Sequence, residues 1–158
     1  MDMKKVLFSL ACLVMLAGCG TAKKAGEVST LSEELPNTAR FSNQFKVFWK
    51  DLVSEVKQSG KSLKKYKPTQ EMVEYYGLVK SNNQYVLTGF IQTDSKKDDA
   101  TKNFDPEKLK GMGITLNEMI TGIYSFRCPL SLLPTLVNQP GMKTVEAGKQ
   151  LKPLHENK

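Results

Sequence analysis

The sequence predicts an α+β fold built on a ferredoxin-like antiparallel sheet, and three observations indicate it. A stretch with helical period precedes stretches in which apolar and polar residues alternate with period 2. Glycine, proline and asparagine divide the second half of the chain into short elements. From residue 84 onward these elements follow the order β-α-β-β-α-β, which is the split βαβ arrangement. We therefore expect one domain over residues 37–158, with the sheet in 74–148, an extra N-terminal strand and a long preceding helix.

The first element is a long amphipathic helix over residues 38–58. Its apolar side chains fall within an arc of about 140° at 100° per residue; they are Phe41, Phe45, Phe48, Trp49, Leu52, Val53 and Val56. Lysines and Ser54 take the opposite face, where Val47 is the apolar exception. Asn37 or Thr38 is the candidate N-cap, and Gly60 marks the expected end. We expect the aromatic face to pack on the sheet; a partner groove or a lipid surface is the alternative.

A lysine-rich connector over 60–68 leads from the helix into a predicted β-hairpin over about 74–93. Two alternating stretches, Tyr75–Lys80 and Tyr85–Ile91, flank a polar turn that contains Asn82 and Asn83. Asparagine tolerates the positive φ of tight hairpin turns. Gly89 lies within the second strand, where glycine indicates a bulge or a close backbone approach.

The remaining elements are short and bounded by turn residues. A polar loop over 94–103 precedes a helix that starts with Asp105-Pro106-Glu107 and stops at Gly111 or Gly113. Strands are expected at 114–116 and 120–128, with a turn at Asn117-Glu118. Ser131 is the candidate cap of a second short helix, with Pro134 in its first turn. A last strand over 142–147 follows Pro140-Gly141, and residues 149–158 form a polar tail.

The N-terminus has the three parts of an export signal. Lys4-Lys5 precedes an apolar stretch from Val6 to Leu16, and small residues lead to Cys19. These 11 residues would span about 16 Å as a helix, which is too short for a membrane span of about 20 residues. The residues Leu16-Ala17-Gly18-Cys19 resemble the lipobox of bacterial lipoproteins, in which the cysteine is acylated and becomes the mature N-terminus. We expect residues 1–18 to be a signal peptide and 19–36 a flexible tether.

This anchor constrains the rest of the interpretation. Cys12 leaves with the signal and Cys19 takes lipid, so Cys128 has no partner for a disulfide. The net charge of +7 falls by one to +6 when two lysines and one aspartate are removed. Export argues against nucleic acid as the partner of this basic chain, and no aromatic residues alternate with the lysines. Surface-exported lipoproteins of some Gram-negative groups resemble one another in an acidic stretch after the lipidated cysteine, and its absence here favours the periplasmic side. We expect a lipid-anchored protein of the outer membrane that faces the periplasm.

The second half of the chain carries several turn and core segments with a familiar order. They are Tyr76-Gly77-Leu78-Val79, Tyr85–Ile91, Leu109–Ile114, Cys128-Pro129-Leu130 and Pro140–Glu146. Over residues 75–152, about half of the chain, they resemble the N-terminal prodomain of subtilisin-like serine peptidases of Bacteroidetes-type bacteria.

The resemblance implies a domain that chaperones and inhibits a peptidase, with its C-terminal tail in the active-site cleft. No catalytic domain follows in this sequence, so we expect such action in trans on an exported peptidase or another envelope protein. Gln150, Leu151, Lys152, Pro153 and Leu154 would then be the partner-binding segment; a frayed terminus is the alternative. A second hypothesis is a structural lipoprotein whose lysines contact anionic lipid or cell-wall polymer.

Catalytic chemistry finds little support in the sequence. The single histidine, His155, lies in the polar tail, and Cys128 ends an apolar strand, where an inert thiol is expected. Metal sites require several clustered His, Cys or carboxylate ligands, which this chain does not group. Gly111-Met112-Gly113 ends a helix, so it offers no phosphate-binding helix start. We therefore expect a protein without enzymatic activity, cofactor or metal.

Overall fold

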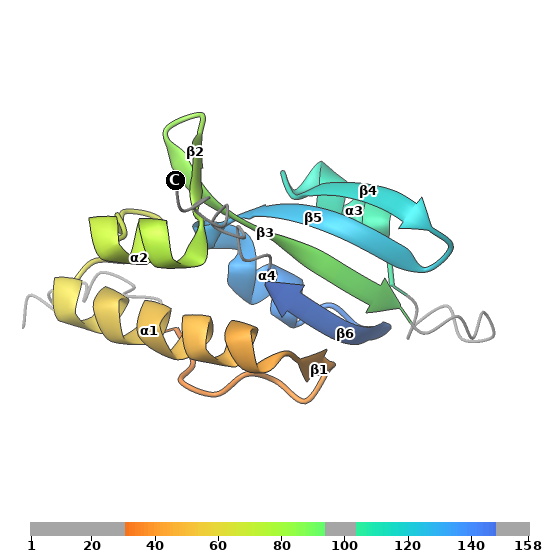
Figure 1. Cartoon of the computed structure of the whole chain (residues 1–158), viewed down its shortest axis with the longest axis horizontal. Helices are drawn as coiled ribbons and strands as arrows, with labels where there is room; N and C mark the ends of the chain where they lie inside the picture. The colour runs from red at the N-terminus through yellow and green to blue at the C-terminus, as the bar shows by residue number, and fades with distance from the viewer. Residues whose placement is uncertain (1–30, 94–103, 148–158) are drawn as a thin grey trace, which may run out of the picture.

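A computed structural model describes residues 31–93 and 104–147, and within them the chain forms a mixed α+β domain. A six-stranded sheet and four α-helices make up this part of the chain (Figure 1). In chain order the elements are β1 Arg40–Phe41, α1 Asn43–Ser59, α2 Gln70–Tyr76, β2 Val79–Ser81, β3 Gln84–Thr93, α3 Pro106–Gly111, β4 Thr115–Ile120, β5 Ile123–Pro129, the 3-10 turn η1 Leu130–Leu132, α4 Leu133–Val137 and β6 Met142–Ala147.

The strands lie in the order β1-β6-β3-β5-β4, with β2 paired to the beginning of β3. All neighbours are antiparallel except β1, which lies parallel to β6 through Arg40↔Thr144 and Phe41↔Val145. The predicted α+β class is therefore confirmed. The short strand β1 was not expected, and it makes the sheet mixed instead of purely antiparallel.

The long helix α1 buries the predicted face, but it begins later than residue 38. Each residue of the predicted apolar face is buried, and Val47 is 51% exposed. Because Arg40 and Phe41 are extended in the sheet, the helix starts at Asn43, where the Ser42 side chain accepts from Phe45 N at 3.2 Å. The expected caps Asn37 and Thr38 are therefore wrong. Gly60 ends the helix in the left-handed conformation, as predicted.

The strand expected at residues 74–80 is wrong, because most of it belongs to helix α2. The Thr69 side chain accepts from Met72 N at 3.2 Å and so caps this helix, and Gly77 ends it at φ 62°. Met72 and Tyr76, four residues apart, share a buried face. The ring of Tyr76 lies 5.0 Å from that of Phe48 on α1, centre to centre. Tertiary packing against α1 thus selects a helix where local alternation favoured a strand.

The hairpin turn expected at 81–84 is confirmed, with a shorter first strand. Asn82 and Asn83 have φ values of 47° and 61° and connect β2 to β3. The second expected turn, Asn117-Glu118, is wrong: both residues lie in β4, paired with Ser125 and Tyr124. The chain instead turns at residues 121–122, so the next strand starts at 123 and not at 120.

The short helices and the last strand follow their sequence signals closely. Asp105 caps α3 by accepting from Lys108 N at 2.9 Å, and the last strand covers the predicted residues 142–147. Pro134 lies in the first turn of α4 as predicted. Ser131 is not a cap, because it lies in η1, which has no side-chain cap hydrogen bond.

The helices pack against one face of the sheet and form a single core with it. This core joins α1 and α2 to the short helices through residues such as Phe48, Leu109 and Leu136. The contributing strand residues lie on one face of the sheet, and on the opposite face Val86 is buried outside this core. Figure 1 shows α3 and α4 partly hidden by the strands, with α1 and α2 side by side.

Residues 31–36 differ from the tether that we expected to reach residue 36. Leu31 is only 9% exposed and belongs to the core, and Leu35 packs against it. The folded part therefore begins at least six residues earlier than predicted, because Leu31 and Leu35 supply apolar surface that the core can bury.

Candidate binding surface

The anchor and tail residues lie outside the described part of the chain. This applies to Leu16, Ala17, Gly18 and Cys19 of the lipobox and to the tail Gln150–Leu154. The signal peptide 1–18, residues 19–30 of the expected tether and the loop 94–103 also lie outside it. Those expectations stay predictions.

Cys128 lies inside the core at the end of β5. Its side chain is 0% exposed, and its thiol lies 3.4 Å from the Pro129 carbonyl oxygen, to which it can donate a hydrogen bond. Burial raises the pKa of the thiol far above its usual range, because the thiolate would lose its hydration. This environment fits the inert thiol that we expected.

Residues 31–93 and 104–147 contain no group of three or more His, Cys, Asp or Glu that could hold a metal ion. In the same residues no helix is both long and apolar enough to cross a bilayer.

The face of the sheet opposite the helices carries several exposed side chains among the described residues. On β3, Leu87 and Ile91 point into the core, whereas Thr88 and Phe90 point the other way. Phe90 is 44% exposed, and its cross-strand neighbours are Ser125 on β5 and Glu146 on β6. We call this the open sheet face; it carries Thr88, Phe90, Thr115, Asn117, Ile120, Ile123, Ser125, Arg127, Thr144 and Glu146.

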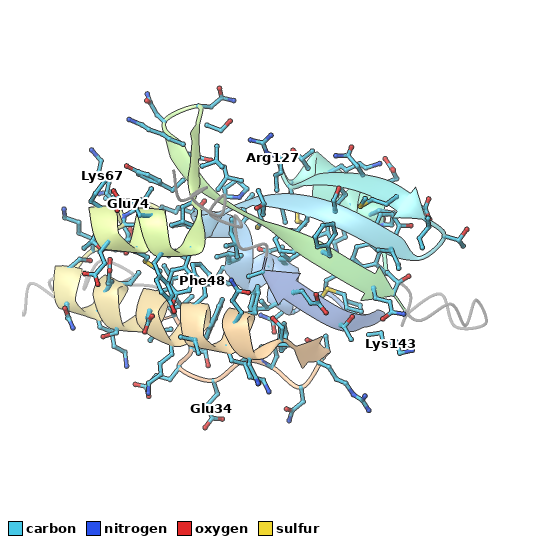
Figure 2. The ribbon with its side chains drawn as sticks, viewed as in Figure 1. Glu34, Phe48, Lys67, Glu74, Arg127 and Lys143 are labelled. Carbon is cyan, nitrogen blue, oxygen red and sulfur yellow. The ribbon has the colours of Figure 1, made fainter. Side chains whose placement is uncertain are left out.

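Apolar and cationic side chains lie close together on the open sheet face. Ile120 is 64% exposed and pairs with Ile123 on β5. Ile123 lies two residues before Ser125, the partner of Phe90, and therefore on the same face of the sheet. Arg127 is exposed between Thr88 and Thr115 and has no ion pair with another described residue. Figure 2 shows Arg127 pointing out from β5, whereas Phe48 lies inside, between α1 and the sheet. Aromatic and arginine side chains are the residues that dominate protein–protein interfaces.

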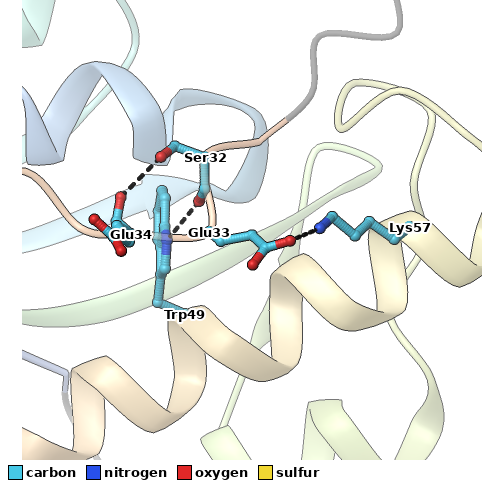
Figure 3. Close-up of polar contacts among 5 residues, drawn as sticks. All are labelled: Ser32, Glu33, Glu34, Trp49 and Lys57. Carbon is cyan, nitrogen blue, oxygen red and sulfur yellow. Dashed lines mark hydrogen bonds and ion pairs between the residues drawn. The ribbon is translucent and has the colours of Figure 1, made fainter.

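A second feature is a recess of about 670 Å³ beside the first described residues. Its lining includes Leu31, Leu35 and Pro36 together with Trp49 and Val137. The Trp49 indole N–H donates to the Ser32 carbonyl oxygen at 3.0 Å, and Lys57 pairs with Glu33 close by (Figure 3). The lysine lowers the pKa of the Glu33 carboxyl through a hydrogen bond and its charge.

Carboxylates of α1 attach α2 and the preceding connector to the long helix. Glu55 accepts hydrogen bonds from the hydroxyls of Tyr66 and Thr69, and Asp51 accepts from Tyr76. Burial raises the pKa of Glu55, but the hydrogen bonds from Thr69 and Tyr66 outweigh it and lower the pKa overall. Burial and Glu55 raise the pKa of Tyr66 well above its usual range, so this phenol stays a donor. These pairs serve packing, since each acid is already satisfied.

Sequence reasoning found neither the recess nor the open sheet face as a site. Phe90, Ile120 and Arg127 occupy outward positions of strands, and that placement depended on the correct strand register. The signal that was present is the apolar Phe90 on the polar face of an alternating strand.

Comparisons with known proteins found no relative of this chain. No protein-family model matches the chain. Neither the curated proteins nor the solved structures contain a significant match.

Proposed function

We propose that this protein is a lipid-anchored, non-enzymatic envelope lipoprotein whose single domain binds another protein through the open sheet face. The observation that carries the proposal is the exposure of Phe90 on the same sheet face as Ile120, Ile123 and Arg127, which forms no ion pair with another described residue. An aromatic residue with an adjacent arginine on a rigid sheet is the composition of an interface centre.

The anchor part of the proposal depends on the sequence. Lys4-Lys5, the short apolar stretch and Leu16-Ala17-Gly18-Cys19 support acylation of Cys19 after removal of residues 1–18. The outer membrane, facing the periplasm, is the proposed location.

A ferredoxin-like arrangement of strands and helices would support a more specific role, binding to an exported peptidase. We propose that β6-β3-β5-β4, with α3 and α4 as the connecting helices, form the ferredoxin-like unit. Such a unit agrees with the resemblance to the prodomain of subtilisin-like peptidases, and the partner would then be an exported peptidase. The tail Gln150–Leu154 follows β6, whose last residue pairs with Gly89 in the middle of the sheet.

The absence of an enzymatic role is proposed from the distribution of reactive side chains. His155 lies in the polar tail, and the Cys128 thiol is buried with its pKa raised by desolvation. Among the described residues, no hydrogen bond joins the Cys128 thiol to a base, which nucleophilic catalysis by a thiol requires.

Inhibition of subtilisin-like peptidases by the purified full chain tests the proposal. We expect slowed cleavage by at least one peptidase of a panel, and weaker inhibition after deletion of 149–158. The double variant F90A/R127A should weaken inhibition by about 30-fold or more, because truncating one interface-centre residue typically costs about 2 kcal/mol or more and such losses are not additive.

The matched control is the double variant V47A/K50A, which removes an exposed apolar residue and a cation from the outer face of α1. It should inhibit like the original chain. No inhibition across the panel would reject the peptidase partner, and equal losses in both double variants would reject the open sheet face as the interface.

A further inference from the structure

The connector between α1 and α2 is the most basic segment of the described chain. Residues 60–69 contain four lysines and no acidic residue, and all four lysines are exposed. We call this set the connector lysines; it consists of Lys61, Lys64, Lys65 and Lys67.

Buried side chains of this segment attach it to the core. Leu63 and Tyr66 are 6% and 8% exposed and insert into the core, and Pro68 is also buried. Lys65 N donates to the Ser62 carbonyl oxygen at 2.9 Å, which closes a turn. Tyr66 is further fixed by its hydrogen bond to Glu55. Since the apolar positions point inward, the lysines between them point outward as a fixed array.

The connector lysines form no ion pair with another described residue, although Glu71 and Glu74 follow on α2. Lys57 and Lys110 pair with Glu33 and Glu107, but no connector lysine forms an ion pair or hydrogen bond through its side chain within 31–93 and 104–147. Four unpaired cations in seven positions repel one another, so an anionic surface would lower their electrostatic energy.

A recess of about 150 Å³ lies beside these side chains. Lys64, Lys65 and Lys67 line it, and none of its lining residues in the described part of the chain is a carboxylate. Asn83, Gln84 and Ser131 also line it and supply amide and hydroxyl donors. The positive φ values of Asn82 and Asn83 fix the turn that forms this side. Cations and neutral donors around one recess suit a phosphate group.

The connector also lies close to the point where the chain enters the fold. Leu31, the first described residue, lines the same recess as Leu63 and Lys64. Leu31 is twelve residues from Cys19, a distance that an extended chain spans in at most about 40 Å. A lipid on Cys19 would therefore keep the connector lysines within reach of the headgroups.

From these observations we infer that the connector lysines bind the phosphate groups of an anionic phospholipid surface and orient the anchored domain on it. The inference rests on the proposed anchor at Cys19. It adds the surface that faces the membrane and the lipid chemistry that this surface recognises.

Amine acetylation, read by mass spectrometry, tests it on the full-length protein purified from membranes and reconstituted into vesicles. One vesicle type is pure phosphatidylcholine, and the other contains phosphatidylcholine with about a third phosphatidylglycerol. Juxtamembrane lysines each gain about 1 kcal/mol near an anionic surface, which corresponds to roughly fivefold in occupancy. We therefore expect labelling of the connector lysines to slow about fivefold on the anionic vesicles at low salt and to recover at about 0.5 M salt.

Lys46 and Lys50 on the outer face of α1 are internal controls whose labelling should not change. The labelling of Lys80 in two variants provides a second measurement. Lys80 pairs with Tyr85, which lines the recess of about 150 Å³, so we expect anionic vesicles to protect Lys80 as well. Protection of Lys80 should disappear in K61Q/K64Q/K65Q/K67Q. It should persist in K46Q/K50Q/K108Q/K143Q, which loses the same charge elsewhere on the surface.

The outcomes separate this inference from the anchor. Equal labelling on both vesicle types would overturn the lipid-facing surface while leaving the anchor in place. Loss of the protein from pure phosphatidylcholine vesicles, together with protection on anionic ones, would reject the anchor and still support the lysine surface. Protection produced by inorganic phosphate on pure phosphatidylcholine vesicles would overturn the assignment to lipid.

Discussion

The ring of Phe126 lies directly over the backbone of Gly89 on the core side of the sheet. A Cβ atom added to Gly89 would lie 2.7 Å from two ring carbons of Phe126 and 2.0 Å from the Glu146 carbonyl oxygen. Phe126 and Ala147, the cross-strand partners of Gly89, come from β5 and β6. The absent side chain thus lets three strands and a buried aromatic ring meet next to Phe90 of the open sheet face.

Gly89→Ala should therefore destabilise the fold. The backbone oxygen cannot yield as a flexible side chain would, so we expect a loss of about 2–3 kcal/mol in the free energy of unfolding, measured by urea denaturation. Gly111→Ala is the control, since nothing lies within 4 Å of its added Cβ, and its effect should stay within about 1 kcal/mol. Similar effects of the two substitutions would contradict the close approach.

Glu55→Gln should weaken the fold in a pH-dependent way. The folded-state pKa of Glu55 is lowered from its ordinary 4.5, so its contribution is present above that pH and is lost as the pH falls through the folded value. The group is partly exposed, so we expect a loss of only about 0.5–1 kcal/mol at pH 7. Urea denaturation at a series of pH values from 7 to 3 checks this, and the difference from the original chain should shrink as the pH falls below 4.5. Glu146→Gln, an exposed control on β6, should show neither effect.

Cys128 should react with thiol reagents only when the domain opens. Its side chain is fully buried and its pKa is raised, so raising the pH from 7 to 9 should not accelerate its modification in the native state. Mass spectrometry of the peptide containing Cys128 follows this reaction, with urea-unfolded protein as the fully reactive reference. Rapid native labelling that rises with pH would show that the thiol is accessible.

Local sequence signals predicted the elements whose ends are set by side chains only a few residues away in the sequence. The aromatic face of α1, the Asp105 cap, the Asn82-Asn83 turn and the last strand are set by side chains next to the backbone groups that they satisfy. The errors have another origin. Residues 70–76 become helical because Tyr76 packs on Phe48, and residues 40–41 become a strand because they pair with β6. Contacts between distant segments decide such cases, and local periodicity does not contain them.

The candidate surface depends on the same kind of information. Phe90, Ile120 and Arg127 share one sheet face only in the observed register of β3, β4 and β5. The turn predicted at Asn117-Glu118 gives β4 a different register, so it does not bring these residues together. The connector lysines were visible as a charged segment, but their fixed display depends on the burial of Leu63 and Tyr66.

The last prediction concerns the boundary between tether and domain. Leu31 belongs to the core and lines the recess next to Trp49, whose indole donates to the Ser32 carbonyl oxygen. If these residues are part of the fold, Leu31→Ala should lower the free energy of unfolding by about 1–2 kcal/mol, less than a deeply buried leucine because it lies at the edge of the core. Urea denaturation followed by Trp49 fluorescence measures it. Glu34→Ala, at an exposed neighbouring position, should stay within about 0.5 kcal/mol.

Combining Leu31→Ala with Trp49→Phe distinguishes direct packing from a general effect on the chain end. Because Trp49 is the single tryptophan of the chain, far-UV circular dichroism follows the unfolding of all variants in this cycle. Residues that share a packed site are coupled, so the loss in the double variant should differ from the sum of the single losses by about 0.5 kcal/mol or more. Additive losses would mean that Leu31 and Trp49 contribute independently. If Leu31→Ala had no effect at all, the segment from residue 31 to 36 would belong to the tether after all, and the domain would begin close to β1.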